Sequence, residues 1–152
     1  MELDKIDKLI LNILQVDSKI TNAALAQQIN LSPAATLERV KKLEQHEIIT
    51  NYVAQVDYAK LGFLVHLMVG VRLQKTTAEH IKLFKLTVDK IAMVTACYQV
   101  IGAFDFILIV HTKHLPSYQA MVVEKLHMLP FVEYLQTLSV VRLIKNKLLS
   151  IE

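Results

Sequence analysis

Hydrophobic residues along the chain change from a helical spacing to an alternating one near residue 63. Before this point, apolar residues first recur every three or four positions at Ile6, Leu9, Ile10, Ile13 and Leu14. Asp4 precedes this run in the position of a helix N-cap, and Thr21 precedes a second, shorter run in the same way. The pattern predicts two helices within the first thirty residues.

A third helix is predicted to follow the second after a very tight turn. Asn30 tolerates the left-handed conformation that ends a helix, Ser32 is a favourable N-cap, and Pro33 suits the first helical position. This helix is predicted over residues 33–47, and its period predicts a buried side formed by Leu37, Val40 and Leu43. Two helices joined in this way form a helix-turn-helix.

The remainder of the chain is predicted to alternate strands with helices. Residues 48–56 are rich in β-branched and apolar side chains, as expected of a strand or wing, and residues 63–73 place apolar side chains at every second position. We further expect helices over 76–91, capped by Thr76 and Glu79, and 115–129, and strands over 93–101, 104–112 and 134–145. The order from residue 63 is βαββαβ, the ferredoxin-like arrangement.

The predicted fold class is α+β, with an N-terminal winged helix-turn-helix followed by a ferredoxin-like βαββαβ domain. Both helices of that domain would cover one face of the sheet, but the strands carry apolar residues on both faces. The second face needs a cover, so we predict self-association.

Composition favours a folded chain with a substantial core, because 53% of the residues are hydrophobic and only three Gly and three Pro are present. The longest apolar runs are shorter than the roughly 18 residues that a membrane helix needs, and the acidic first seven residues lack the basic region of an export signal. Cys97 is the single cysteine. We therefore expect a cytoplasmic protein with no disulfide, no bound metal, no cofactor and no membrane partner.

Net charge alone does not indicate a DNA-binding protein. The chain carries +3, but residues 1–50 hold six Lys or Arg against seven acids, and the surplus lies in the remainder. The argument depends instead on the third helix, whose small leading residues suit a close approach to base edges and whose cations suit flanking phosphates. The predicted DNA-binding residues are Ser32, Pro33, Ala34, Ala35, Glu38, Arg39, Lys41 and Lys42.

Several segments together resemble the Lrp/AsnC family of leucine-responsive, "feast/famine" transcription factors. They are "LDKIDKLILNILQVD", "LAQQINLSPAATLERVKKLEQHEII", "VIGAFDF" and "TLSVVRLIK", and their order spans nearly the whole chain. The resemblance implies a winged helix-turn-helix that binds double-stranded DNA and a ferredoxin-like domain that dimerises. It also implies that dimers often assemble into octamers, with an amino acid bound between dimers.

The resemblance further implies an effector site on the last strand and on the hairpin that joins the predicted strands at 93–101 and 104–112. Its residues are Gly102, Ala103, Phe104, Asp105, Leu138, Ser139 and Val140. Two positions depart from the family pattern. Ala103 stands where the family usually has an acidic residue, and Arg142-Leu143 stands where it usually has an acidic pair. Both departures remove negative charge near the implied site, so the sequence leaves the identity of the effector open.

The resulting domain prediction is a DNA-binding helix-turn-helix at 1–50, a linking strand and linker at 51–61, and an oligomerisation and effector domain at 62–152. The leading interpretation is a transcriptional regulator and not an enzyme, modulated by a small molecule of the amino-acid class. One alternative is an effector-blind protein that wraps DNA through its oligomer. Another is a haem-precursor decarboxylase on the same scaffold, for which the candidate pocket residues are His66, His111, Arg72 and Arg142.

Overall fold

Two aspartates start helix α1 (Lys5–Val16) in the computed structural model, which describes residues 2–152. The Asp4 carboxylate accepts hydrogen bonds from the backbone N–H groups of Ile6 and Asp7, both at 2.8 Å. The Asp7 carboxylate in turn accepts from the Asp4 N–H at 3.2 Å. This capping box satisfies N–H groups that a helix start leaves free, and it confirms Asp4 as the N-cap.

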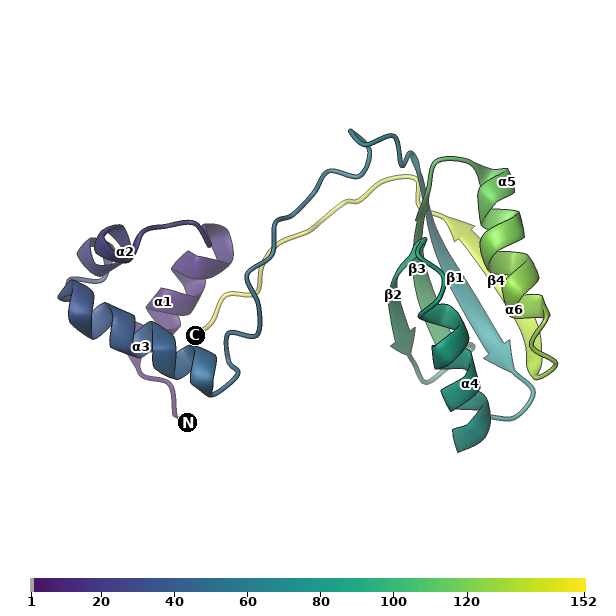
Figure 1. Ribbon diagram of the computed structural model, residues 1–152, viewed down its shortest axis with the longest axis horizontal. Coiled ribbons are helices and arrows are strands. Elements are labelled where there is room, and N and C mark those ends of the chain that lie inside the picture. Colours follow the sequence, from purple (N-terminus) through teal and green to yellow (C-terminus); the bar gives the residue numbers. More distant parts are fainter. Residues whose placement is uncertain (1) are drawn as a thin grey trace. The chain divides into compact units, whose positions relative to one another are not determined.

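The helix-turn-helix is confirmed by helices α2 (Asn22–Gln28) and α3 (Pro33–Gln45) (Figure 1). Asn30, in the turn between them, has a φ of 54°, the left-handed conformation that the sequence predicts. The Asn22 side-chain amide donates to the Pro33 carbonyl at 2.8 Å. The start of α3 is thus fixed to α2 by a side chain as well as by the turn.

Helices α1, α2 and α3 enclose a small core of buried side chains, formed by Ile10, Leu11, Leu25, Ile29 and Leu43. The prediction that Leu37 is buried is wrong, since its exposed fraction is 43%. Helix α3 turns Thr36 inward in its place, and Thr36 is completely buried. The buried Thr36 hydroxyl has a hydrogen-bond partner, because it donates to the Ser32 carbonyl at 3.0 Å.

These helices belong to the first of two compact units, which consists of residues 2–55 and 145–152. The strand expected over 48–56 is not formed, and residues 51–57 pair with no strand within the described part of the chain. An extended segment without a neighbouring strand makes no ladder hydrogen bonds.

The second unit, residues 56–144, is a four-stranded antiparallel sheet in the order β2-β3-β1-β4. Its strands are β1 (Val65–Leu73), β2 (Val94–Gln99), β3 (Phe106–Thr112) and β4 (Val132–Ser139). The helices are α4 (Ala78–Val88) and a second, continuous helix formed by α5 (Leu115–Tyr118), a π-helical turn (Gln119–Val123) and α6 (Glu124–His127). Figure 1 shows α4, α5 and α6 on the same face of the sheet, which confirms the ferredoxin-like arrangement.

Two element boundaries differ from the predictions. Helix α4 is capped by Thr77, whose hydroxyl accepts from the His80 N–H at 3.2 Å, and not by Thr76. Strand β4 ends at Ser139 instead of continuing to residue 145. The strand ends there because Ser139 pairs with Leu67 and β1, its only partner, begins just two residues before Leu67.

The sheet buries one face against the helices and leaves its other face without a helix. The buried face carries Leu67, Val69, Val71 and Leu73 of β1 and Phe106, Leu108 and Val110 of β3. On the other face, Met68 lies between Ile109 of β3 and Leu138 of β4 in register. Gly70 also points to this face, where the ring of Phe104 covers it.

Replacing Gly70 with Ala is expected to lower the free energy of unfolding by about 1–3 kcal/mol, the usual range for an overpacked site. A Cβ at this position would lie 2.7 Å from three carbon atoms of the Phe104 ring, so the ring would have to move. Urea unfolding measures the change.

The matched control is the same substitution in a Phe104→Ala background, where the clash is absent. There, Gly70→Ala should cost nothing or stabilise, because glycine weakens a strand interior. An equal cost in both backgrounds would show that the ring is not the obstacle.

Candidate DNA-binding and effector sites

The predicted DNA-binding residues begin at the cap of helix α3. The Ser32 hydroxyl accepts from the Ala35 N–H at 3.2 Å, and Pro33 occupies the first turn, where its missing N–H costs nothing. Seven of the eight predicted residues are exposed, namely Ser32, Pro33, Ala34, Ala35, Glu38, Lys41 and Lys42. Ala34, Glu38 and Lys41 recur at helical spacing and so share one face of α3.

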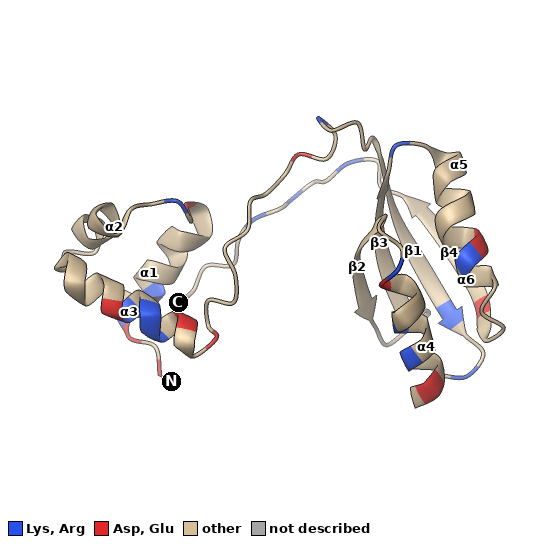
Figure 2. Cartoon of the chain, in the orientation of Figure 1, with Lys and Arg blue, Asp and Glu red and all other residues tan. Residues whose placement is uncertain are grey.

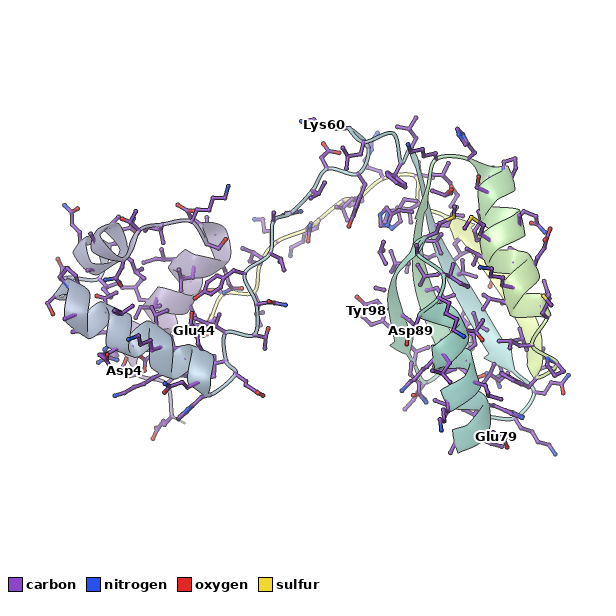
Figure 3. All side chains as sticks on the ribbon, in the orientation of Figure 1. Asp4, Glu44, Lys60, Glu79, Asp89 and Tyr98 are labelled. Carbon is purple, nitrogen blue, oxygen red and sulfur yellow. The ribbon has the colours of Figure 1, made fainter. Side chains whose placement is uncertain are left out.

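Arg39 is the exception, because its guanidinium turns toward the start of α1. Its Nη1 lies 2.7 Å from Asp4 Oδ2 and 2.7 Å from Asp7 Oδ1. Figure 3 labels Asp4 next to helix α3. The hydrogen bond to Asp4, followed by that to Asp7, raises the pKa of Arg39. The pKa of Asp4 is lowered, first by the Asp7 N–H and then by Arg39.

Sequence patterns do not predict this ion-pair cluster, because they indicate Asp4 only as a helix N-cap. Asp7 is 5% exposed, so its charge is removed from water and needs a partner. Arg39 supplies that partner and joins α1 to the middle of α3. The cluster therefore positions α3, and it also engages Arg39, one of the three cations of α3 that are predicted to bind DNA.

Helix α3 also carries Lys41 and Lys42, whose side chains are both exposed. Figure 2 shows the basic residues of α3 in blue and its acidic residues in red. Lys41 lies 3.9 Å from Glu38, a weak exposed pair. Glu44 accepts a hydrogen bond from the Tyr52 hydroxyl at 2.8 Å. Burial, and then this bond to a carboxylate, raise the pKa of Tyr52 to about 12. Glu44 is thus engaged by Tyr52.

Asp105 of the predicted effector site connects the hairpin between β2 and β3 to the end of β1. Its Oδ2 accepts from the Leu73 N–H at 2.8 Å and its Oδ1 from the Thr76 hydroxyl at 2.8 Å. Arg72 donates from Nη1 to the carbonyls of Gly102 at 2.9 Å and Ala103 at 3.1 Å. These polar contacts hold the hairpin in one conformation.

Burial alone would raise the pKa of Asp105, but the bonds from Leu73 and Thr76 and the charge of Arg72 together lower it. The carboxylate is therefore charged at neutral pH. Both of its oxygens are already bonded to residues at and just after the end of β1.

The seven predicted effector residues lie in two groups along β1. Gly102–Asp105 adjoins the end of β1, where the Asp105 N–H donates to the Val71 carbonyl. Leu138–Val140 adjoins its beginning, where the Val140 N–H donates to the His66 carbonyl. The groups come closest on the helix-free face, because the Phe104 ring covers Gly70 and Leu138 pairs with Met68, two residues or about 7 Å along the strand.

The residues considered for a decarboxylase pocket do not converge. His66 and His111 stack with ring centroids 4.3 Å apart, next to Tyr58. Arg72 lies toward the other end of β1 and is bonded to hairpin carbonyls, and Arg142 is exposed beyond β4. Over residues 2–152, no cluster of three or more His, Cys, Asp or Glu could hold a metal ion. Within the same range, no helix combines the length and apolarity needed to cross a membrane.

Comparison with known families assigns both parts of the chain. Residues 3–50 match the family described as "Winged helix-turn-helix DNA-binding", and residues 66–148 match the "Lrp/AsnC ligand binding domain". The chain belongs to the Lrp/AsnC family. It is a transcriptional regulator with a DNA-binding domain and a ligand-binding domain, and the prediction that it is not an enzyme is confirmed by this membership.

Curated relatives in the Lrp/AsnC family support this assignment over most of their length. The Bkd operon transcriptional regulator of Pseudomonas aeruginosa is 35% identical over 131 residues, which cover 86% of each chain. The leucine-responsive regulatory protein of Escherichia coli is 32% identical over 145 residues, which cover 95% of this chain and 88% of that one.

A solved structure extends the similarity to the Lrp/AsnC fold as a whole. It is a transcriptional regulator from Neisseria meningitidis in complex with L-Met, with a TM-score of 0.91 and 26% sequence identity. The match covers 99% of this chain and 97% of that one.

Replacing Asp105 with Asn is expected to change how stability depends on pH. A lowered pKa in the folded state means that Asp105 contributes stability above its unfolded-state pKa of about 3.9, and that this contribution is lost as the pH falls through the folded-state value. Asp105→Asn should therefore destabilise the protein at pH 7 and reduce the decline in stability below about pH 4.

Urea unfolding at pH 7, 4 and 3 measures this effect, with Glu133→Gln, an exposed acid on β4, as the control. If both variants declined with pH as the wild type does, Asp105 would not be the titrating group.

Proposed function

We propose that the protein binds double-stranded DNA through the exposed face of α3. The observation that carries this proposal is the helix that starts immediately after the turn, at Ser32-Pro33, within a segment of the DNA-binding family. Ala34 and Ala35 are small enough for a close approach to base edges and for contact with thymine methyl groups, and Glu38 can accept from the amino group of cytosine.

Within this proposal, the cations of α3 divide into two roles. Lys41 and Lys42 are exposed and are assigned to phosphates. Arg39 is assigned as a positioning residue, because its guanidinium already binds two carboxylates of α1. Since chromosomal DNA is the proposed target, we also propose a cytoplasmic location.

We also propose that the protein acts as a dimer formed through the helix-free face of the sheet. Three apolar side chains from neighbouring strands meet there, Met68, Ile109 and Leu138, and Tyr98 at the edge is 57% exposed. Burying such a surface favours association. A two-fold dimer presents two α3 helices and so favours pseudo-palindromic DNA, and dimers of this kind can assemble further, up to an octamer.

The proposed effector is an amino acid, bound where two copies meet. Two observations support this: a related regulator was solved with L-Met, and Phe104 and Leu138, one from each group of predicted effector residues, lie on the helix-free face where a second copy is proposed to pack. Residues of that second copy would complete the site. Because Phe104, Leu138 and Val140 are apolar and Ala103 adds no charge, the proposed ligand has an apolar side chain.

The double substitution Lys41→Ala with Lys42→Ala is expected to weaken DNA binding at all sequences. It should also reduce the slope of log affinity against log salt by about 1 for each phosphate that the variant no longer neutralises. Binding titrations at several salt concentrations measure both effects. Stability should change by less than about 0.5 kcal/mol, because both side chains are exposed.

Arg39→Ala provides the contrast with the double lysine substitution. It should lower the free energy of unfolding by about 1–3 kcal/mol, because Asp7 would lose the partner of a charged hydrogen bond. A double lysine variant with wild-type affinity and salt dependence would exclude the proposed face of α3.

An amino-acid effector is expected to raise the melting temperature of the protein and to change its DNA affinity. A ligand at 100 times its Kd stabilises the folded state by about 2.7 kcal/mol. Thermal unfolding against each of the twenty amino acids, followed by DNA titration with any that bind, measures both effects. An absence of shifts across the whole set would favour the alternative of an effector-blind architectural protein.

A further inference from the structure

Residues 145–152 pack within the first unit, against helix α1. The Asn12 side chain forms two hydrogen bonds with the backbone of Ile151: its Nδ2 donates to the carbonyl at 3.0 Å, and its Oδ1 accepts from the N–H at 3.0 Å. The Gln15 amide donates to the Leu149 carbonyl at 3.3 Å. Two side chains one helical turn apart thus bind an extended segment that lies more than 130 residues away in the sequence.

The contacts to Asn12 require an amide side chain at this position. A carboxamide is both a donor and an acceptor, and here it bonds the N–H and the carbonyl of one residue, as a neighbouring strand would. A carboxylate could accept from the N–H but could not donate to the carbonyl. Asn12 is therefore suited to recognise an extended backbone.

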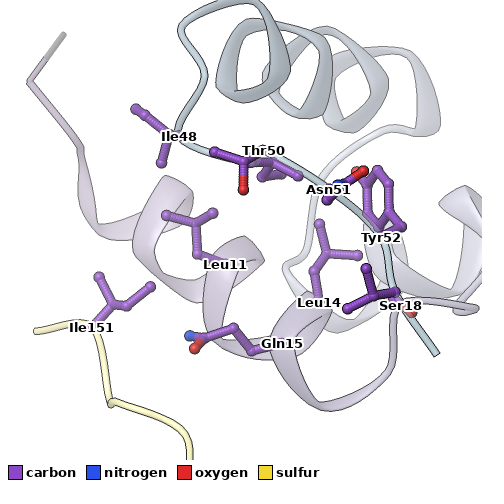
Figure 4. A pocket seen from close by; sticks show the side chains of 11 residues that line it. Leu11, Leu14, Gln15, Ser18, Ile48, Thr50, Asn51, Tyr52 and Ile151 are labelled. Carbon is purple, nitrogen blue, oxygen red and sulfur yellow. The ribbon is translucent and has the colours of Figure 1, made fainter. Parts of the chain in front are cut away.

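Ile151 adds an apolar contact to these hydrogen bonds. It packs against the core of the first unit, whereas the Leu149 side chain is 82% exposed and contributes only its carbonyl. Figure 4 shows Ile151 next to a hollow of about 350 Å³ between α1 and residues 48–53, with Leu11 and Leu14 among its lining. Ile151 lines this hollow without filling it, so the segment is held by few contacts.

We propose that residues 145–152 are a docking segment for α1, and that this segment connects the end of β4 to the DNA-binding unit. Only nine residues separate Ser139, the last residue of β4, from Leu149. The stretch that follows β4 thus connects the predicted effector residues Leu138–Val140 directly to α1. It is a separate connection from the segment that follows α3. This route for regulation relies on the proposed function, whereas the docking itself does not.

Hydrogen exchange of the full-length protein tests the docking. Asn12→Ala keeps α1 helical but removes both bonds to Ile151, and Ile151→Asp removes the apolar contact. Each should reduce the protection of the α1 amides by roughly 5- to 30-fold, the effect of removing one or two weak interactions. Leu149→Asp is the matched control, because its exposed side chain makes no such contact, and it should exchange like the wild type.

Three results would overturn the docking assignment. The first is wild-type protection in both Asn12→Ala and Ile151→Asp. The second is an equal loss of protection in Leu149→Asp. The third is protection that rises with protein concentration over a hundred-fold range, which would mean that the segment comes from a second copy.

DNA titration with and without L-Met tests the regulatory route in the same variants. Asn12→Ala should still bind DNA and still show the thermal shift with L-Met, but its DNA affinity should no longer depend on L-Met. A variant that keeps the full dependence would exclude this route. If L-Met changed neither the stability nor the DNA affinity of the wild type, the proposed effector would be wrong, and hydrogen exchange would still decide the docking.

Discussion

Strand β1 is hydrogen-bonded along both edges, to β3 and to β4, and the second unit is organised around this double pairing. Because side chains alternate along a strand, the register places Val69 and Val71 in the core and Met68 and Gly70 on the opposite face. A shift of one residue would exchange the two faces. The same strand also carries the contacts of both groups of predicted effector residues, with Phe104 over Gly70 and Leu138 beside Met68.

In the first unit, a few polar groups serve more than one purpose. Asp4 and Asp7 cap α1 and also bind Arg39, so capping and the packing of two helices depend on the same carboxylates. This arrangement also accounts for the negative sum of charges over residues 1–50. Two of the acids in that range are paired with Arg39, and the exposed face of α3 keeps Lys41 and Lys42.

Features set by local sequence could be predicted, and features set by distant contacts could not. The caps at Asp4 and Ser32 and the turn at Asn30 follow from neighbouring residues, and so does the order of the strands and helices. Helical periodicity defines the edge of a helix face only to within one residue, so it could not show that Arg39 turns toward α1 and finds its partners there. For the same reason, the buried position beside Val40 was assigned to Leu37 and not to Thr36.

The effector prediction illustrates a different limit. A family resemblance implies which residues are involved, but it does not state how they are arranged in space. The pairing of β1 with β4 fixes where β4 ends, and that end depends on where β1 begins, more than sixty residues earlier in the sequence. Strand ends therefore depend on the partner strand more than on local propensity.

The π-helical turn between α5 and α6 has a consequence for how related chains align. Tyr118, Val122 and Leu126 are all buried at a spacing of four, although four residues overshoot an α-helical turn by about 40°. The wider turn at Gln119–Val123 offsets this drift and keeps the three side chains facing the sheet. A homologue with one residue fewer in this turn would keep the same core in a regular α-helix, and a single gap in this helix would mark a neutral change of length.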